Sequence, residues 1–336
     1  MGKIPMGRFM KLIIRKRKDK ERDMRYKTFR KMAVYALTQE LGMGYRARIK
    51  RDVGCNGVKE YALVLDNIFF EPSVLPLLPL KPYYKKYQGE EITNDCIAQI
   101  LSDYHKLMAD MTEADGREQA LFEWEAVKGH VYPMVVCRKK NREFLAGLAK
   151  RKLLDLAVCY IIRLEDFDGL HGFRPLKVGK DMCRAWGISE TELHAQALEN
   201  MKTDGYEIRE MEQTLCELGR IASPNEEIKD EMFILTNERK LFGAAGMLLD
   251  DGFFRDNFGD RNFYIIPSSI HELLLVPDKG DRSVEALNQM VWEVNHDTMK
   301  RQERLVDHVY YYDREKKEVQ DVREMSLPKI YLQRRR

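Results

Sequence analysis

The 336-residue chain has no run of apolar residues long enough to cross a membrane, which requires about 20. Its longest apolar runs, around Val158–Ile162 and Leu273–Val276, have the length of β-strands. The first residues lack the apolar core and small-residue cleavage site of a signal peptide. We therefore expect a cytoplasmic protein without a transmembrane segment.

Paired cysteines and the common catalytic and cofactor motifs are also missing. The six cysteines contain no Cys-x-x-Cys pair, which argues against a disulfide framework and against a zinc site of closely spaced thiolates. Gly-x-Gly-x-x-Gly, His-Glu-x-x-His and Gly-x-Ser-x-Gly do not occur. We expect no cofactor and no metal, and we favour a protein without enzymatic activity.

The net charge of +3 is distributed unevenly along the chain. Residues 1–31 contain thirteen Lys/Arg and three acidic residues, a net charge of +10, so the remainder carries −7. We expect residues 1–24 to form a basic, disordered arm. Association with nucleic acid through this arm is an alternative function, and a solvated tail without a partner is the simpler interpretation. The candidate phosphate contacts are Lys11, Arg15, Lys16, Arg17, Lys18, Lys20 and Arg22.

Strand and helix patterns alternate along the rest of the chain, which predicts a layered α/β or α+β fold with mixed sheets and interleaved helices. We predict an N-terminal α/β region over residues 25–222 and a C-terminal α/β region over residues 223–336; the alternative is one continuous domain. The predicted elements include a helix from residue 25 that ends near Gly42, a hairpin of Tyr45–Val53 with Val58–Leu65, strands at Val131–Cys137 and Leu153–Leu164 around a short helix at Glu143–Ala149, a helix capped by Ser189–Glu192, a helix from Ser283 to His296, and a hairpin of Val309–Tyr312 with Val319–Val322.

Four short motifs resemble those of a family of uncharacterised bacterial proteins, a domain of unknown function. They are Asn56–Val58, Trp186–Glu190, Ile234–Asn237 followed by Gly243–Ala245, and Ile266–Glu272. The resemblance covers most of the chain after residue 25. It implies a shared fold and no assigned activity.

The segment Phe263–Val276 carries the densest group of candidate site residues. Two apolar strands flank a polar turn, and polar groups at strand ends are where α/β folds tend to place function. We predict a binding surface for a ligand or a protein partner from this turn and the Thr236-Asn237 turn. Its candidate contacts are Thr236, Asn237, Pro267, Ser268, Ser269 and His271.

The same turn permits a catalytic alternative. An acid–base hydrolase would use Ser268, Ser269, His271 and Glu272. However, a nucleophile needs a base within hydrogen-bond reach, and Ser269 and His271 are too close in sequence to reach that geometry easily. The favoured interpretation is that these side chains cap the local backbone, and that the protein binds a ligand or partner without catalysis.

Overall fold

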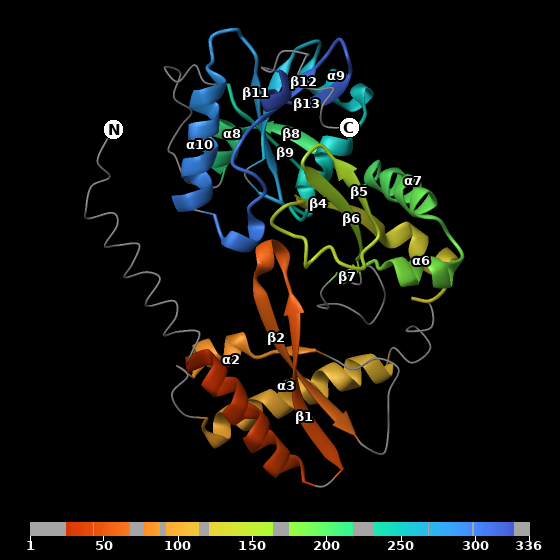
Figure 1. Cartoon of the computed structure of the whole chain (residues 1–336), viewed down its shortest axis with the longest axis vertical. Coiled ribbons are helices and arrows are strands. Elements are labelled where there is room, and N and C mark those ends of the chain that lie inside the picture. Colours follow the sequence, from red (N-terminus) through yellow and green to blue (C-terminus); the bar gives the residue numbers. More distant parts are fainter. Residues whose placement is uncertain are drawn as a thin grey trace, which may run out of the picture. The chain divides into compact units, whose positions relative to one another are not determined.

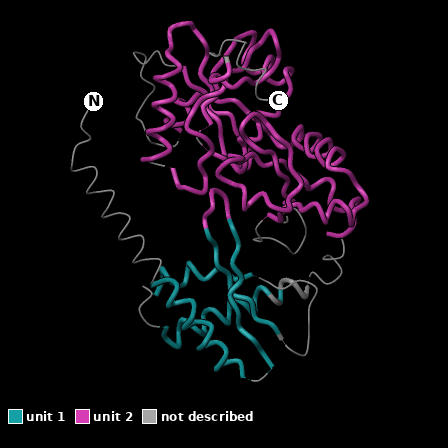
Figure 2. Tube along the Cα trace, in the orientation of Figure 1, with its two compact units in different colours: residues 1–53, 59–118 teal, residues 54–58, 119–336 magenta. Residues whose placement is uncertain are grey.

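A computed structural model describes residues 25–42, 44–67, 77–87, 92–113, 121–163, 175–217, 231–267, 269–297 and 299–325. The chain forms two compact units, which Figure 2 colours separately. Unit 1 comprises Met1–Val53 and Lys59–Glu118, and unit 2 comprises Gly54–Val58 and Gln119–Arg336. Within the described ranges, no helix combines the length and apolar character needed to cross a membrane. The region boundary predicted at residue 222 lies outside the described residues.

Unit 1 combines a small antiparallel sheet with helices (Figure 1). The sheet has the order β1-β2-β3, with β1 at Tyr45–Val53, β2 at Lys59–Asn67 and β3 at Leu78–Pro79. The helices cover residues 25–41, Lys81–Lys86 (α2) and Asn94–Glu113 (α3). The first helix and the β1–β2 hairpin were both predicted, and the structure confirms them.

The core of unit 1 follows from helical spacing. Phe29, Ala33 and Leu37 recur every four residues, so they lie on one face of the first helix and are buried together. They pack with Leu63 of β2 and Ile100 of α3, which are also buried. This apolar face, rather than the intrinsic propensity of the helix, stabilises the unit.

The turn between β1 and β2 belongs to unit 2 and closes in left-handed backbone conformations. Asn56 has φ 57° and Gly57 has φ 68°, as the Asn-Gly signal predicts. Asn56 is buried and pairs with Asn141, whose Nδ2 donates to Asn56 Oδ1 over 2.9 Å. Asn56 Nδ2 also donates to the carbonyl oxygens of Arg301 and Arg304. These bonds satisfy the amide inside unit 2.

One sheet of unit 2 centres on β6 (Leu156–Ile162), which pairs antiparallel with β4 (Val131–Cys137), β5 (Lys150–Leu153) and β7 (Leu176–Lys177). Short helices α5 (Trp124–Val127) and η2 (Lys128–His130) precede β4, and α6 (Lys180–Trp186) and α7 (Glu190–Met201) follow β7. Every residue of β6 is buried, as its apolar run predicts. The capping box of α7 forms, since Ser189 Oγ accepts from Glu192 N and the Glu192 carboxylate accepts from Ser189 N.

The helix predicted at Glu143–Ala149 is absent, and the segment forms consecutive turns. Gly147 has φ 75°, a left-handed conformation that interrupts a right-handed helix. Ala149 N then donates to the carbonyl of Val178, so the backbone turns toward the β7 region instead of continuing a helix.

The second sheet of unit 2 has six strands in the order β13-β12-β10-β11-β9-β8, all paired antiparallel (Figure 1). Its strands are β8 (Glu207–Glu210), β9 (Phe233–Thr236), β10 (Phe263–Ile266), β11 (Leu273–Pro277), β12 (Tyr310–Asp313) and β13 (Glu318–Asp321). The helical elements of this part are α8 (Met211–Glu217), η4 (Gly243–Leu248), α9 (Asp251–Phe258), α10 (Val284–Asp297), η5 (Arg301–Glu303) and α11 (Val322–Met325).

Apolar packing joins helices to this second sheet. Leu287 and Val291 of α10 pack with Ile266, Val276 and Val309 in one buried cluster. The small residues of η4 let its backbone contact β4, β9 and β11, so η4 links the two sheets of unit 2. Antiparallel sheets interleaved with helices confirm the predicted mixed α/β class.

Candidate functional site

The corner predicted as the binding surface lies where β9 ends and β10 turns into β11. The structure brings the Thr236-Asn237 turn and the 267–272 turn together, because Thr236 Oγ1 donates to the carbonyl of His271 over 2.9 Å. Thr236 and Ser269 are 8% and 2% exposed, Asn237 is fully buried, and Pro267 is buried as well. Most of the predicted contact residues therefore point into the fold.

The hydrogen bonds of this corner run to the local backbone. Ser269 Oγ accepts from His271 N over 3.0 Å, and His271 Nδ1 accepts from Phe242 N over 3.2 Å. Between these two described residues no side-chain to side-chain hydrogen bond is present. The described part of the corner thus shows no nucleophile–base contact of a hydrolase, and a catalytic role for Ser269, His271 and Glu272 stays a prediction.

Burial perturbs the two titratable groups of the corner. Desolvation lowers the pKa of His271 and raises the pKa of Glu272, in both cases by disfavouring the charged form. Both side chains are half-buried and are the two described members of the corner with surface left for a ligand. Ser268 and the arm residues Lys11, Arg15, Lys16, Arg17, Lys18, Lys20 and Arg22 lie outside the described residues.

Asn237 belongs to a buried ionic group that we call the Arg163 cluster: Tyr132, Arg163, Asp204 and Asn237. Arg163 binds the Asp204 carboxylate through two nitrogens, and both side chains are 4% exposed. Asn237 Nδ2 donates to Asp204 Oδ2 over 2.8 Å, and the Tyr132 ring lies 3.5 Å from the Arg163 guanidinium carbon. Every charge in this cluster is paired inside the protein, which indicates a structural role.

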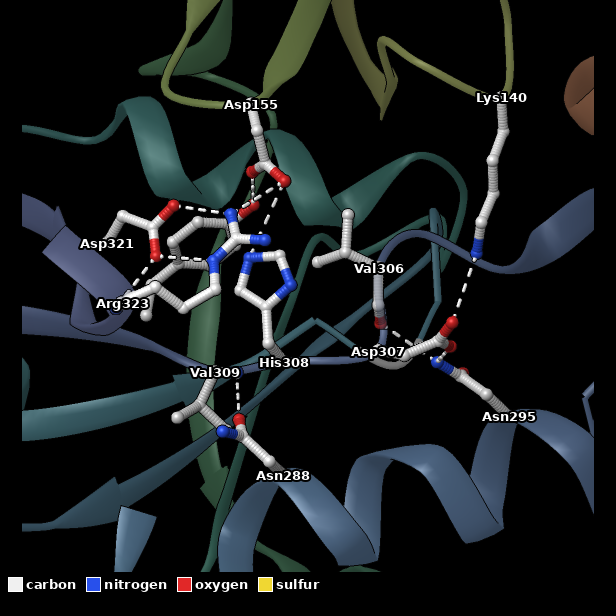
Figure 3. A network of polar contacts seen from close by, with 11 residues as sticks. Lys140, Asp155, Asn288, Asn295, Val306, Asp307, His308, Val309, Asp321 and Arg323 are labelled. Carbon is white, nitrogen blue, oxygen red and sulfur yellow. Dashed lines mark hydrogen bonds and ion pairs between the residues drawn. The ribbon is translucent and has the colours of Figure 1, made fainter. Parts of the chain in front are cut away.

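A second ionic group, the Asp155 cluster, comprises Asp155, His308, Tyr310, Asp321 and Arg323 (Figure 3). Asp155 lies in the β5–β6 turn, while His308 precedes β12 and Asp321 ends β13. Arg323 lies between the two carboxylates: its Nη2 donates to Asp155 Oδ2 over 2.9 Å, and its Nε donates to Asp321 Oδ1 over 2.9 Å. Residues far apart in sequence thus meet at one point.

The Asp155 cluster holds its carboxylates ionised. Burial opposes ionisation of Asp155, but His308, the Tyr310 hydroxyl and Arg323 outweigh it and hold the pKa of Asp155 well below its usual range. Burial likewise opposes ionisation of Asp321, and the hydrogen bonds from Arg323 outweigh it, so the pKa of Asp321 is also lowered.

His308 is the incompletely satisfied member of the Asp155 cluster. Its side chain is 10% exposed, and its buried Nε2 has no hydrogen-bond partner. The nearest carboxylate oxygen, Asp155 Oδ2, is 3.6 Å away, which is too long for a hydrogen bond. A buried polar atom without a hydrogen-bond partner is uncommon, and a bound ligand is one way to satisfy His308 Nε2.

Helix α10 fixes the segment that carries His308 (Figure 3). Asn295 Nδ2 donates to the carbonyl of Val306 and to Asp307 Oδ1, each over 2.9 Å. Val309 N donates to Asn288 Oδ1 over 2.9 Å. Because both flanks of His308 are held by amides of α10, its ring has a defined position beside the two carboxylates.

A third feature is a pocket of about 380 Å³ beside the β5–β6 hairpin, which we call the basic pocket. It is lined by Arg138, Arg142, Leu145, Lys150, Arg151, Lys152 and Ala157. Five of these seven residues are cationic, and none is acidic or aromatic. The pocket therefore offers a concentrated positive potential, and its lining has no aromatic surface.

Few of these cations are neutralised nearby. Lys150 Nζ donates to the carbonyl of Leu145 over 2.7 Å, and Arg151 Nη2 donates to Thr191 Oγ1 over 2.9 Å. The nearby Glu190 carboxylate accepts from Lys150 N over 3.1 Å, but its ion pair is with Lys180. Arg138, Arg142 and Lys152 are exposed and form no ion pair with another described residue. Five positive charges thus converge with little local compensation.

The sequence contained a signal for this pocket that local patterns alone did not single out. Residues 138–152 include seven Lys/Arg and one Glu, in two runs separated by the apolar Phe144–Ala149 segment. The turns after β4 lead into β5 and bring the two basic runs to the same pocket. This proximity depends on the fold and cannot be read from the sequence. The Asp155 cluster had no comparable signal, since Asp155 lies more than 150 residues from the other members.

A family model matches residues 26–314, and the family is described as a family of unknown function (DUF5688). No curated protein and no solved structure matches the chain. The match covers most of the chain after residue 25, which confirms the predicted resemblance to a family of unknown function; the bacterial source and the four motifs stay predictions.

Proposed function

Because the chain belongs to DUF5688, a family without an assigned function, we propose from the geometry alone that it is a non-enzymatic binding protein for a phosphate-bearing ligand. The observation that carries this proposal is the basic pocket, in which five Lys/Arg side chains converge and no carboxylate belongs to the lining. The proposal keeps the ligand-binding class predicted from the sequence and moves the main contact from the β10–β11 corner to the β5–β6 hairpin.

The chemistry of the lining favours phosphate over other anions. An arginine guanidinium presents paired N–H donors that match two oxygens of a phosphate, and Arg138, Arg142 and Arg151 supply three of them. Lysine adds a point charge that follows the phosphate without a fixed geometry. A ligand with several linked phosphates uses more of these donors at once than a single carboxylate does.

The absence of aromatic side chains from the lining indicates how much of a nucleotide ligand the pocket would contact. Recognition of a nucleobase normally uses stacking on an aromatic or planar group, together with hydrogen bonds to the base edges. The residues that line the basic pocket include no aromatic side chain on which a base could stack. The proposed contact is therefore with the phosphates of a nucleotide or of a nucleic-acid strand, without choice of base.

The proposal places the protein in the cytoplasm, where both sources of linked phosphates are abundant. Free cysteines are consistent with a reducing compartment: all six are unpaired, and four of them are buried. Recovery of the protein in a cytosolic fraction, rather than an extracellular one, tests this part of the proposal.

Isothermal titration of the full chain with inorganic tripolyphosphate at low salt tests the proposed ligand class directly. We expect one-site binding that weakens at least tenfold in the variant Arg138→Ala/Arg142→Ala/Lys152→Ala. These three side chains are exposed, so the variant is expected to fold normally. Parallel titrations with a nucleoside triphosphate and with a single-stranded oligonucleotide distinguish the two sources of the phosphates.

The matched control removes the same charge elsewhere in unit 2. Lys202, Arg255 and Lys279 are exposed and each pairs with a carboxylate, so Lys202→Ala/Arg255→Ala/Lys279→Ala changes the net charge equally. We expect this control to bind tripolyphosphate nearly as wild type does. Equal weakening in both variants would reduce the effect to net charge and overturn the proposal.

A further inference from the structure

The Asp155 cluster combines three side chains with the chemistry of metal ligands. One ligand atom each from Asp155, His308 and Asp321 lies within 4.8 Å of the others. Two carboxylates and one imidazole make a three-ligand set that leaves a further coordination position open, as in zinc sites that bind water or a ligand. The imidazole favours a transition metal over Ca²⁺ or Mg²⁺, which prefer oxygen ligands.

A second observation points to a ligand at the same place. The His308 side chain is nine-tenths buried, and its Nε2 has no hydrogen-bond partner. Figure 3 shows the ring directed toward the space between Asp155 and Asp321 that the Arg323 guanidinium occupies. The Nε2 atom, which makes no hydrogen bond, is thus placed beside two carboxylates where an imidazole nitrogen can serve as a metal ligand.

The Arg323 guanidinium marks where a cation is stabilised. It contacts both carboxylates, yet its side chain is 49% exposed, so it can leave toward solvent without a large burial cost. Around a metal at about 2.1 Å from each ligand, tetrahedral ligand atoms lie about 3.4 Å apart. The three ligand atoms lie within 4.8 Å of one another here, so the widest separation has to close by up to about 1.4 Å. The Arg323 and Asp155 side chains are 49% and 34% exposed, so this adjustment takes place at the surface rather than in the close-packed core.

We propose that Asp155, His308 and Asp321 form a binding site for a divalent transition-metal ion, and that Arg323 occupies the cation position when the metal is absent. The Tyr310 hydroxyl, which donates to Asp155 Oδ1, orients that carboxylate in both states. The site goes beyond the proposed phosphate binding and does not depend on it, because no residue is shared between the Asp155 cluster and the basic pocket.

Titration of the chelator-treated full chain with Zn²⁺, and with Co²⁺ as a spectroscopic probe, tests the site. We expect one ion bound per chain, with the visible absorption bands of Co²⁺ in a low-symmetry nitrogen–oxygen site. Arg323→Ala removes the competing guanidinium and is expected to bind Zn²⁺ at least tenfold more tightly than wild type. His308→Gln and Asp321→Asn are expected to bind at least tenfold more weakly.

The Arg323→Ala variant keeps the proposal falsifiable even if a ligand substitution disturbs folding. A purely structural ion cluster predicts that removing Arg323 leaves two unpaired carboxylates and no specific metal binding. His296→Gln, at an exposed histidine on α10, is the control for adventitious binding and is expected to leave the titration unchanged. Absence of stoichiometric binding in both wild type and folded Arg323→Ala would overturn the proposal, as would loss of binding in His296→Gln.

Discussion

The Arg163 cluster and the Asp155 cluster are both arginine–aspartate groups in unit 2, yet they are completed differently. In the Arg163 cluster both charged side chains are 4% exposed. The Asn237 amide donates to the Asp204 carboxylate, and the Tyr132 ring packs against the Arg163 guanidinium. In the Asp155 cluster Arg323 is 49% exposed, Asp155 is 34% exposed, and the buried His308 Nε2 makes no hydrogen bond. The first is closed and the second is open.

The difference teaches which charges are available for function. A buried ion pair with every donor and acceptor satisfied can change only by breaking, and breaking it leaves a charge inside the protein. An open cluster can exchange its cation, and the exposed cations of the basic pocket can gain an anion. We therefore assign the Arg163 cluster to the fold, and the Asp155 cluster and basic pocket to binding.

Removing one partner from each cluster should give the largest contrast. Asp204→Ala leaves the buried Arg163 guanidinium uncompensated and is expected to lower the free energy of unfolding by about 3–5 kcal/mol. Arg323→Ala removes a half-exposed cation but leaves the 5% exposed Asp321 carboxylate without it, so a smaller cost of about 1–3 kcal/mol is expected. Urea denaturation of the two variants measures both values, and equal losses would show that the clusters are not closed and open as described.

Exchanging the Asn237 amide and the Asp204 carboxylate tests whether the Arg163 cluster requires one amide and one carboxylate at these two positions. Asn237→Asp places a second carboxylate where Nδ2 now donates to Asp204 over 2.8 Å, with an expected cost of about 2–4 kcal/mol. The double variant Asn237→Asp/Asp204→Asn again has one carboxylate and one amide, and it should recover part of this loss. Additive losses in denaturation of the double variant would contradict a direct contact between the two side chains.

The corner beside the Arg163 cluster should tolerate no added methyl group at Gly243. A Cβ there would lie 2.4 Å from the carbonyl oxygen of His271 and 2.6 Å from Thr236 Oγ1. Gly243→Ala is therefore expected to destabilise unit 2 by about 1–3 kcal/mol, measured by thermal or urea unfolding. Gly129→Ala is the control, because its Cβ would meet no atom within 4 Å; a comparable loss there would remove the contact argument.

The smallest expected effect is a pH dependence from His271. Burial lowers its pKa in the folded state below the ordinary 6.5, so the unfolded chain binds the proton more readily. Stability from this group is complete above pH 6.5 and is lost as the pH falls below that value. His271→Asn keeps an acceptor for Phe242 N and cannot titrate, so its stability should fall less between pH 7.5 and pH 5.5. Identical pH profiles of stability for wild type and His271→Asn would show that another group causes the pH dependence.

Much of the fold was predictable because its signals are local. The Asn56-Gly57 turn requires left-handed backbone angles that these residue types adopt, and the Ser189–Glu192 capping box forms between neighbours in sequence. The buried strand at Val131–Cys137 has the predicted bounds, because a long apolar run between turn signals leaves one strong interpretation. The helix expected at Glu143–Ala149 failed where tertiary pairing of Ala149 with Val178 competed with a short local pattern.

The candidate sites were less predictable because they depend on distant residues. Asp155 meets Tyr310 and Arg323 across more than 150 positions, and no motif records such a meeting. The β10–β11 corner looked like a site from its polar composition, yet Asn237 and Ser269 use their polar groups to satisfy buried backbone and charge. The sequence composition identified polar residues that could bind or react. Their burial in the structure shows which of them stabilise the fold instead.

The salt dependence of oligonucleotide binding tests the central claim about the basic pocket most directly. Wild type and Arg138→Ala/Arg142→Ala/Lys152→Ala share residues 1–24, so a difference in the slope of log affinity against log salt concentration reports the pocket alone. Each lost phosphate contact with a single strand reduces the slope by about 0.7, so we predict a reduction of ~2 in the variant. Equal slopes for the two proteins would contradict the account.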